Sequence, residues 1–421
     1  MATERTAAER ADGDAAGQVV ELDVGPVAHG GHCVARHEGR VVFVRHTLPG
    51  ERVRARLTDA APDARYWRAD AVEIVEASPD RVESAWPQAG PGGVGGGELA
   101  HVALSAQRAW KAAVLGEQLH RLAHLERDVP VHAAPGDGER GGLRWRTRID
   151  LVADEHGRAG MRGYRSHQVH PLTSMPLATE AIEALGLFDR RWSAGAHIAA
   201  VAPAAGDTPL VLVDGQPFDL RRGRPDPRPN ARTAVHERVG EHTYRVSAAG
   251  FWQVHREAPG VLLDAVLTGV GDVAGRTVLD LYAGAGLFTV PLADAVGPGR
   301  VVAVEGDERA VRDARRNVHD RPQVTLHAGD VGRVLGTGVA AAGDEVAAVV
   351  LDPPRTGAGR RVVEAVAGLA PARVVYVACD PAALARDIAF FAGHGYGLDD
   401  VQGYDLFPMT HHVEAVAILS R

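Results

Sequence analysis

Cys379 is the side chain with the clearest capacity for covalent chemistry in this sequence. It ends a run of apolar and β-branched residues, in the order Val377-Ala378-Cys379-Asp380-Pro381. A buried cysteine in a strand is usually inert packing. Cys379, however, comes where a predicted strand reaches the carboxyl edge of its sheet, and ligands of such sheets bind at that edge. We therefore predict that Cys379 is a nucleophile and that Cys33, which has no such neighbours, is structural.

A second segment at the same edge reads Asp352-Pro353-Pro354-Arg355. Two consecutive prolines at a strand end fix the backbone and remove two hydrogen-bond donors, a stiffness that an ordinary loop seldom needs. Enzymes that methylate the exocyclic amino groups of adenine or cytosine carry a similar segment, which ends in an aromatic residue that stacks on the flipped base. The fourth residue here is Arg355, which argues against amino methylation.

A glycine turn follows the first strand of the predicted sheet. Asp280 is followed by Gly284 and Gly286, and the turn leads into a helix. Glycines let a ligand approach the backbone closely. A dinucleotide fingerprint would place a third glycine or an alanine at position 289, where this chain has Thr289, so a nicotinamide cofactor is disfavoured.

Two further acids follow the next strands of the sheet. Glu305 ends the second strand, where a carboxylate can accept hydrogen bonds from both ribose hydroxyls of an adenosine ligand. Asp330 follows the third strand and is placed to meet the adenine. A glycine turn alone is weak evidence, but the ordered set of Asp280, the turn and Glu305 predicts a site for S-adenosylmethionine.

These residues require a doubly wound α/β sheet to position them. From about residue 260, apolar strand-length runs alternate with segments of helical length, which is typical of a buried parallel sheet. The five predicted strands cover residues 278–282, 301–305, 324–326, 347–351 and 374–377.

The N-terminal part has a different pattern. Four strand-length segments rich in β-branched residues are separated by turn residues, and they cover 19–24, 41–44, 52–57 and 69–75. Together they predict a short five-stranded, OB-like barrel. Residues 29–68 contain eight arginines and four acids, with Tyr66 and Trp67 available for stacking. This composition fits either a face that binds single-stranded nucleic acid or a basic barrel with a structural role only. Two more arginine-rich stretches follow, at 144–170, which predicts a hairpin turning at 154–157, and at 221–238.

Composition excludes several classes of protein. The 421 residues carry 46 basic and 54 acidic side chains, a net charge of −8. Apolar runs are far shorter than the roughly 20 residues of a membrane span. Because the N-terminus lacks the apolar core of a signal peptide, we expect a cytoplasmic protein. Two cysteines cannot form a thiolate metal site, which needs about four ligands, and no metal site is predicted.

Three segments of the sequence together resemble the RNA 5-methyluridine methyltransferases. They are Asp352 to Arg355, Tyr376 to Pro381 with the following Leu384, Arg386 and Asp387, and the terminal sequence from Asp405 to Glu414. Pro49-Gly50-Glu51 is similar to part of a TRAM domain, the RNA-binding barrel often fused to these enzymes. The segment Phe251-Trp252-Gln253-Val254 resembles the entry to their catalytic domain.

The resemblance implies a domain organisation and roles for particular residues. Residues 1–16 would be a disordered tail, 17–77 the TRAM barrel, 78–250 a linker and a central α+β RNA-binding domain, and 251–421 a Rossmann-like class I methyltransferase domain. Cys379 would be the nucleophile and Glu414 the base. The residues expected to bind S-adenosylmethionine, including those that we predict from the pattern itself, are Gln253, Tyr282, Gly284, Glu305, Asp330 and Asp352.

Two departures from the family pattern matter. Many members carry an iron–sulfur cluster on four cysteines, three in a segment that here spans 86–97 and a fourth near Met175, and none of these positions is cysteine. No cluster is expected. His255 stands where asparagine is more usual, which would alter substrate fit without changing the chemistry.

The sequence therefore predicts an RNA uracil-5-methyltransferase that uses S-adenosylmethionine. Ribosomal RNA is the favoured substrate, because the TRAM-bearing branch more often modifies it, and transfer RNA is the alternative. Another alternative is a catalytically silent RNA-binding or RNA-folding factor, against which the intact Cys379 and Glu414 argue. A small-molecule methyltransferase would leave the barrel and the arginine patches without a purpose. No membrane association and no obligate protein partner is indicated.

Overall fold

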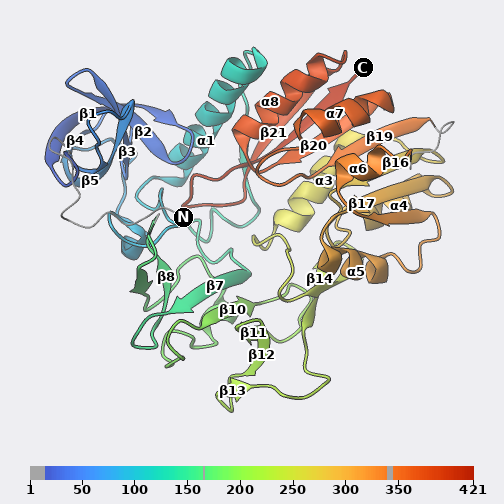
Figure 1. Ribbon diagram of the computed structural model, residues 1–421, viewed down its shortest axis with the longest axis horizontal. Coiled ribbons are helices and arrows are strands. Elements are labelled where there is room, and N and C mark those ends of the chain that lie inside the picture. Colours follow the sequence, from blue (N-terminus) through green and yellow to red (C-terminus); the bar gives the residue numbers. More distant parts are fainter. Residues whose placement is uncertain (1–14, 165, 339–344) are drawn as a thin grey trace. The chain divides into compact units, whose positions relative to one another are not determined.

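A computed structural model describes residues 15–164, 166–338 and 345–421 (Figure 1). Most of the predicted tail, residues 1–14, lies outside this range. The chain divides into two compact units, neither of them continuous in sequence. The first comprises Met1–Trp110, Arg162–His170 and Pro408–His411, and the second comprises Lys111–Met161, Pro171–Phe407 and His412–Arg421. The division into four sequence segments remains a prediction.

The first unit contains a closed five-stranded barrel, as predicted. Its strands follow the order β1-β2-β3-β5-β4. Only β3 and β5 run parallel to each other. The barrel strands are β1 (Val19–Ala28), β2 (His32–His37), β3 (Arg40–Arg45), β4 (Arg52–Asp59) and β5 (Tyr66–Glu76).

Buried and exposed residues alternate along the barrel strands, so that one face of each strand packs inside the barrel. In β4, Val53, Ala55 and Leu57 are buried while their neighbours face outward. Strand β2 was not predicted, because its two histidines and one arginine interrupt an apolar pattern. Its Cys33 is completely buried opposite Val44, and burial raises the pKa of the thiol to about 12. This environment agrees with the structural role predicted for Cys33.

Glu51, of the Pro-Gly-Glu motif, is the buried anchor of the barrel. Its carboxylate accepts hydrogen bonds from the Leu48 amide at 2.9 Å and from the Ser78 amide at 3.2 Å. It also forms an ion pair with Arg81, with N···O distances of 2.5 and 2.7 Å. Glu51 thereby links the turn before β4, which contains Leu48, to the segment after β5, which contains Ser78 and Arg81.

The second unit is built on an eight-stranded sheet of order β18-β17-β16-β19-β20-β22-β21-β6. All five predicted strands are present and parallel: β16 (Thr277–Leu281), β17 (Arg300–Glu305), β18 (Val324–Ala328), β19 (Val346–Leu351) and β20 (Arg373–Ala378). Strand β22 (Glu414–Ser420) pairs antiparallel with β20 and with β21 (Gly397–Asp405), and β6 (Val131–Ala133) pairs parallel with β21.

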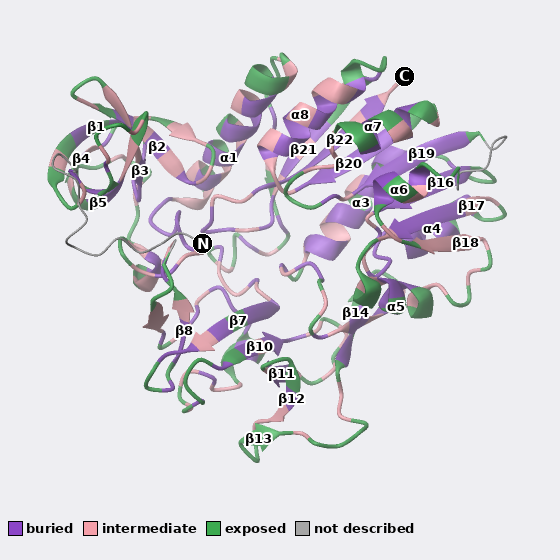
Figure 2. Cartoon of the chain, in the orientation of Figure 1, coloured by how far each residue is buried: buried purple, intermediate pink, exposed green. Residues whose placement is uncertain are grey.

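Helices cover both faces of this sheet, so that its central strands are purple in Figure 2. Alternate strand residues enter two separate cores. On one face Val278 packs with α3 (Ala258–Val270) and α4 (Thr289–Val296), and on the other Leu279 packs with α6 (Val331–Leu335), α7 (Gly359–Gly368) and α8 (Pro381–Ala392). Burial on both faces is the reason that these strands read as continuous apolar runs.

The remaining elements lie before residue 320. A second sheet has the order β13-β12-β11-β10-β7-β8-β9, and the predicted turn at 154–157 joins β7 to β8 as expected. Its strands are β7 (Arg148–Ala153), β8 (Ala159–Arg162), β9 (Val169–Pro171), β10 (His197–Val201), β11 (Leu210–Val213), β12 (Gln216–Asp219) and β13 (Arg224–Pro225). The other elements are the hairpin β14 (Ala234–Val239) and β15 (His242–Ser247), and the helices η1 (Pro87–Ala89), α1 (Leu104–Gln118), η2 (Leu119–Ala123), α2 (Glu180–Glu183) and α5 (Glu308–Asn317).

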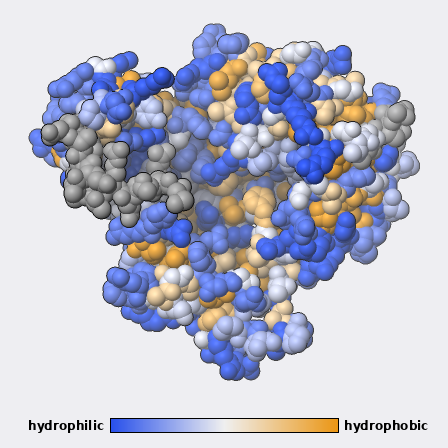
Figure 3. Space-filling view, viewed as in Figure 1, coloured by the Kyte–Doolittle hydropathy of each residue, from blue (hydrophilic) through white to orange (hydrophobic). Residues whose placement is uncertain are grey.

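Two observations concern membranes and metals. None of the helices in the described ranges combines the length and the apolar character needed to cross a bilayer. Hydrophilic side chains predominate on the face drawn in Figure 3. In the same ranges, no three histidine, cysteine or acidic side chains are grouped to hold a metal ion. Trp86, at the start of the segment that would carry cluster cysteines, is instead buried in the first unit.

Candidate active site

Cys379 and Glu414 meet at the carboxyl edge of the eight-stranded sheet. Cys379 is the first residue after β20, and Glu414 is the first residue of β22. The antiparallel register pairs Ala378 with Ala415, so the next pair along these two strands is Cys379 and Glu414. The register thus brings the predicted nucleophile and the predicted base together from positions 35 residues apart in the chain.

The thiol of Cys379 is neutral in this environment. Its side chain is half-buried, and burial raises its pKa from 9.0 to about 12, with further increases from the charges of Glu414 and Asp352. The Arg355 guanidinium acts in the opposite direction. A thiolate nucleophile therefore requires additional positive charge or a substrate that accepts the developing negative charge.

Glu414 is almost completely buried. Burial raises the pKa of its carboxyl well above 4.5, the nearby Asp352 raises it further, and Arg355 lowers it. The positive charge of Arg355 thus lowers the pKa values of both Cys379 and Glu414. Its Nη2 lies 3.5 Å from Nε2 of His412.

Asp387 fixes the loop that carries Asp352 and Arg355. Its buried Oδ2 accepts hydrogen bonds from the Tyr376 hydroxyl at 2.7 Å and from the amides of Ala358 and Gly359 at 2.8 and 3.1 Å. These donors belong to the end of the loop and to β20. Asp387 therefore ties the loop after β19 to the strand that ends at Cys379.

The glycine turn holds a second set of carboxylates. Asp280 is completely buried, and its Oδ2 accepts a hydrogen bond from the Thr289 hydroxyl at 2.5 Å. Burial raises the pKa of Asp280 to about 7, and the charge of Glu305 adds to the increase. Its Oδ1 has no hydrogen-bond partner among the described residues. A buried carboxylate with an open acceptor is a candidate contact for a cationic or hydrogen-bond-donating ligand.

Glu305 closes the turn from the neighbouring strand. One carboxylate oxygen accepts from the Gly284 amide at 2.7 Å and the other from the Asp307 amide at 2.6 Å. Gly284 has a φ of 59°, and a side chain placed there would meet no protein atom within 4 Å. The space beside the turn is therefore open to a ligand. Tyr282 also has a left-handed backbone, with a φ of 65°.

Asp352 links the two sets of carboxylates. Burial, followed by the charges of Asp280 and Glu305, raises its pKa to about 7. Asp330 follows strand β18. Its Oδ1 caps α6 by accepting a hydrogen bond from the Arg333 amide at 2.9 Å. Gln253 is buried in the segment that precedes α3. Contacts of any of these residues with a ligand remain predictions.

Two protein families match parts of this chain. Residues 15–72 match the TRAM domain family, and residues 337–421 match the family described as tRNA (Uracil-5-)-methyltransferase. An uncharacterized RNA methyltransferase of Streptomyces coelicolor is 45% identical over 96% of this chain and 93% of its own length. One of Bifidobacterium longum is 42% identical over 95% of this chain and 96% of its own length.

The chain belongs to the RNA uracil-5-methyltransferase family. It is also similar to the crystal structure of the Pyrococcus abyssi tRNA (uracil-54, C5)-methyltransferase in complex with S-adenosyl-L-homocysteine. The TM-score is 0.69 and the sequence identity 22%, and the match covers 95% of this chain and 100% of that one. This similarity confirms the predicted fold class, a methyltransferase domain combined with an N-terminal barrel.

The structure gives roles to two residues for which the sequence pattern indicates none. Thr289, which disfavours a dinucleotide fingerprint, donates a hydrogen bond from its hydroxyl to Asp280. Asp387 lies between Leu384 and Ile388 on the buried face of α8. An acid at such a position requires buried hydrogen-bond partners, and this pattern is the signal in the sequence that could identify it.

His255 is part of a buried cluster. Its ring stacks on Trp145 with centroids 5.5 Å apart, and its Nε2 lies 3.0 Å from an Asp137 oxygen. Its Nδ1 accepts from the Glu257 amide at 3.0 Å. Trp145 in turn contacts Phe407 edge to face. These contacts give His255 a packing function in the segment between Gln253 and α3.

Proposed function

We propose that this enzyme methylates carbon 5 of a uridine in ribosomal RNA through a covalent adduct between Cys379 and carbon 6 of the ring. The observation that supports this mechanism is the pairing of Cys379 with Glu414 across β20 and β22. A thiol and a carboxylate on one side of a substrate ring are the two groups that the reaction needs.

The residues of the glycine turn fit S-adenosylmethionine. When bound, this cofactor supplies an electrophilic methyl group on a sulfonium cation. Glu305 would accept hydrogen bonds from the ribose hydroxyls, the open space beside Gly284 would admit the cofactor against the backbone, and Asp330 would meet the adenine. Asp280 and Asp352 would face its positive charge, which offsets the cost of burying their ionised forms. We also assign Gln253 and Tyr282 to this site.

The first chemical step is the addition of Cys379 to the ring. Carbon 5 of uracil is too weak a nucleophile to attack a methylsulfonium unaided. The thiol releases its proton to solvent, and the thiolate forms a bond to carbon 6 while the electron pair of the 5,6 double bond moves into an enolate. Arg355 lowers the pKa of Cys379, and this effect favours the thiolate. The enolate then directs electrons to carbon 5, which takes the methyl group.

The second step removes the proton from carbon 5. Glu414, in its ionised form, takes this proton, and the electron pair of the broken C–H bond reforms the double bond as the bond between sulfur and carbon 6 breaks. Elimination restores the Cys379 thiolate and releases 5-methyluridine. Because burial and the charge of Asp352 raise the pKa of Glu414, its ionised form in this step depends on the positive charge of Arg355, since the sulfonium charge is lost with the methyl group.

Transfer RNA is the second candidate substrate, because the family matched by residues 337–421 is described as acting on it. Either RNA must present the uridine unstacked, at a cost of a few kcal/mol. Contacts of the barrel arginines with phosphates would offset this cost and make RNA binding strongly dependent on salt. Raising the salt concentration should weaken RNA binding steeply and leave the affinity for S-adenosylmethionine nearly unchanged.

The deciding experiment is incubation with labelled S-adenosylmethionine and separate pools of unmodified ribosomal and transfer RNA, followed by nucleoside analysis. Label in 5-methyluridine from the ribosomal pool supports the proposal. Label only in the transfer RNA pool would correct the substrate. RNA that binds to the protein but acquires no label in either pool would favour the silent RNA-binding factor.

A further inference from the structure

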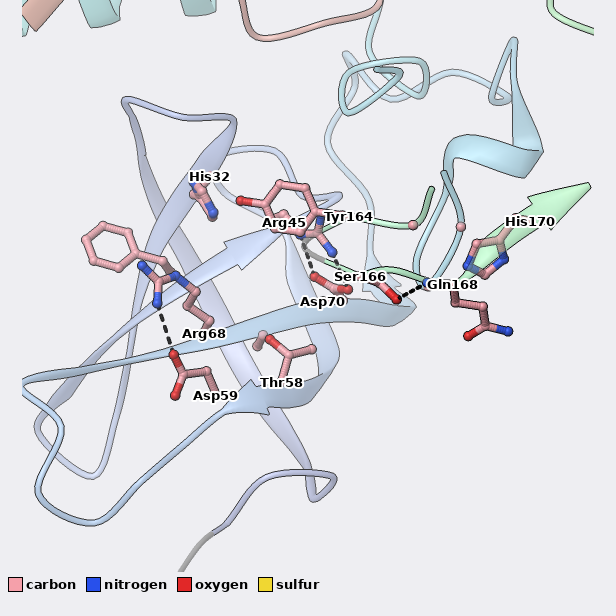
Figure 4. Close-up of a pocket in the computed structure, with 15 residues that line it drawn as sticks. His32, Arg45, Thr58, Asp59, Arg68, Asp70, Tyr164, Ser166, Gln168 and His170 are labelled. Atoms are coloured by element: carbon pink, nitrogen blue, oxygen red, sulfur yellow. Dashed lines mark hydrogen bonds and ion pairs between the residues drawn. The ribbon is translucent and has the colours of Figure 1, made fainter. Parts of the chain in front are cut away.

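A pocket of about 370 Å³ lies in the first unit, which contains none of the candidate active-site residues (Figure 4). This volume falls within the range of roughly 300–1,000 Å³ that is typical of small-ligand sites. Residues of the barrel form one side of the pocket, and residues of the segments 92–93, 163–164 and 166–170 form the other. The pocket therefore combines the barrel with two loops from other parts of the sequence.

Arg45 and Tyr164 form a rigid stack in this pocket. The Arg45 guanidinium makes two hydrogen bonds to the Asp70 carboxylate, at 2.8 and 2.6 Å, and the side chains of this pair are about nine-tenths buried. The guanidinium carbon lies 3.7 Å from the centre of the Tyr164 ring. Figure 4 shows the ring of Tyr164 over Arg45, with Asp70 joined to the edge of the guanidinium by dashed lines. The salt bridge thus fixes the orientation of an aromatic ring at the pocket.

A second aromatic ring belongs to the barrel wall. Phe43 lines the pocket and contacts Tyr66 edge to face, with ring centroids 5.2 Å apart. Neither Tyr66 nor Trp67, the residues that the sequence offers for stacking, lines the pocket. The Trp67 ring lies under the Arg40 guanidinium at 4.7 Å and donates its N–H to the Ala61 carbonyl. Phe43 and Tyr164 are therefore the phenyl rings that line the pocket, beside the imidazoles of His32 and His170.

The charges in the pocket cancel. Arg45 is paired with Asp70, and Arg68 is paired with Asp59 at 3.0 Å. Two carboxylates would repel a phosphate, and both guanidinium groups already have anionic partners. The Asp59 side chain remains 54% exposed and can accept further hydrogen bonds. A flat, uncharged ligand with hydrogen-bond donors on its edge suits such a pocket, and a nucleobase has this chemistry.

The loop side of the pocket is also ordered by the backbone. Val94 pairs with Gly163 in an isolated β-bridge. The Ser166 amide donates to the Gly163 carbonyl at 3.1 Å, and the Gln168 amide donates to the Ser166 hydroxyl at 3.0 Å. A side chain at Gly93 would meet the Gln88 carbonyl at 2.0 Å. Backbone hydrogen bonds and the three glycines Gly92, Gly93 and Gly163 therefore order this wall, on which the side chains of Tyr164 and Gln168 line the pocket.

We propose that this pocket binds the base of an unpaired RNA nucleotide other than the uridine that is methylated. The inference rests on the proposed function in one respect, namely that RNA is the substrate. It goes further in assigning to the first unit a base-stacking site, in addition to contacts with phosphates. Such a site would bind one nucleotide of the RNA while the target uridine, a different nucleotide of the same RNA, is bound by the second unit.

The test compares Tyr164→Ala with the matched control Tyr164→Phe, which keeps the ring, in the full-length protein. The probe is a fluorescently labelled single-stranded RNA of about 12 nucleotides, a length that suits one barrel of this kind. Fluorescence anisotropy measures the dissociation constant over a range of salt concentrations. We expect Tyr164→Ala to weaken RNA binding about tenfold or more, and Tyr164→Phe to bind as the unchanged protein does.

The salt dependence identifies the kind of contact. Loss of a stacking contact should raise the dissociation constant by the same factor at every salt concentration, because no phosphate contact is lost. Equal affinity of the Ala and Phe variants would overturn the proposal. A smaller salt slope for Tyr164→Ala would also overturn it, since the residue would then act on a phosphate.

A second measurement does not depend on the folding of a variant. RNA that contains 5-bromouridine or 4-thiouridine is photo-cross-linked to the unchanged protein, and mass spectrometry locates the modified peptides. Cross-links at Tyr164 or Phe43 support the pocket, and cross-links confined to the second unit contradict it. The RNA-pool experiment remains separate: RNA bound through Tyr164 without any 5-methyluridine would refute the proposed function and leave the base site standing.

Discussion

Lys111, the only lysine in the chain, is completely buried and donates a hydrogen bond to Asp405 at 2.5 Å. Its Nζ also donates to the Phe407 carbonyl at 3.0 Å. These contacts hold the end of β21, from which the chain proceeds to Glu414. A lysine has a compact ammonium group with three donors, and it fits here where a planar guanidinium would need more room.

Lys111→Met should lower the free energy of unfolding by about 3–5 kcal/mol, because it leaves the buried Asp405 carboxylate without its cation. Chemical denaturation followed by fluorescence measures the loss. Arg121→Met is the matched control. It breaks an exposed ion pair with Glu117, four residues away on the chain, and should cost about 0.5 kcal/mol or less. Equal losses for the two variants would contradict the anchoring role of Lys111.

Glu414→Gln should trap the covalent intermediate. Addition of Cys379 and methyl transfer do not require a base at carbon 5, but elimination does, so the adduct should accumulate while turnover falls by about 10²- to 10⁴-fold. A denaturing gel with labelled RNA measures the protein-bound fraction. Cys379→Ser should show no adduct, and Glu308→Gln, at an exposed acid of α5, should behave as the unchanged enzyme. Absence of an adduct with Glu414→Gln would count against this carboxylate as the base.

The fold was predictable where burial produces a local pattern. Four of the five parallel strands, β16, β17, β19 and β20, are buried on both faces, so each appears in the sequence as a largely apolar run. The site residues at the ends of those strands could therefore be assigned to one edge. Strand β2 was missed because only Cys33, Val34 and Ala35 of its six residues are apolar.

Contacts between distant segments were not predictable in the same way. Lys111 and Asp405 are 294 positions apart, and no local pattern pairs them. Strand β6 adds three residues, Val131–Ala133, to the sheet of the methyltransferase domain, although the sequence assigned that region to a central domain. The stack of Tyr164 on Arg45 likewise joins a loop to the barrel across 119 positions. Only tertiary structure brings such residues together.

Asp387→Asn tests whether the loop that carries Asp352 and Arg355 must be fixed. An amide in place of the carboxylate puts an N–H group or a weaker acceptor opposite the Tyr376 hydroxyl and the Ala358 amide. We expect kcat to fall by up to about 10²-fold, because small displacements of reacting groups are costly, with little change in the KM for RNA. Asp399→Asn, at an exposed position, is the control. An unchanged kcat for Asp387→Asn would show that the loop holds its position without this anchor.

His255→Asn should reduce stability more than activity. The variant loses the stack on Trp145 and lengthens the contact with Asp137. The expected cost is about 1–2 kcal/mol in the free energy of unfolding, measured by denaturant titration. The exposed His394→Asn should cost much less. A variant that keeps its stability but changes its preference among RNA substrates would instead assign His255 to substrate recognition.

The affinity for S-adenosylmethionine should rise between pH 6 and pH 8. Burial raises the pKa values of Asp280 and Asp352 to about 7, so the fraction of ionised carboxylate increases through this interval. The sulfonium cation favours the ionised forms, and the dissociation constant should therefore fall by about tenfold for each carboxylate that must be ionised. S-adenosylhomocysteine has the same adenosine and amino acid but no sulfonium, so its affinity should change much less. Isothermal titration calorimetry with both compounds at each pH measures the difference. Parallel pH dependences for the two compounds would exclude these carboxylates as the partners of the sulfonium.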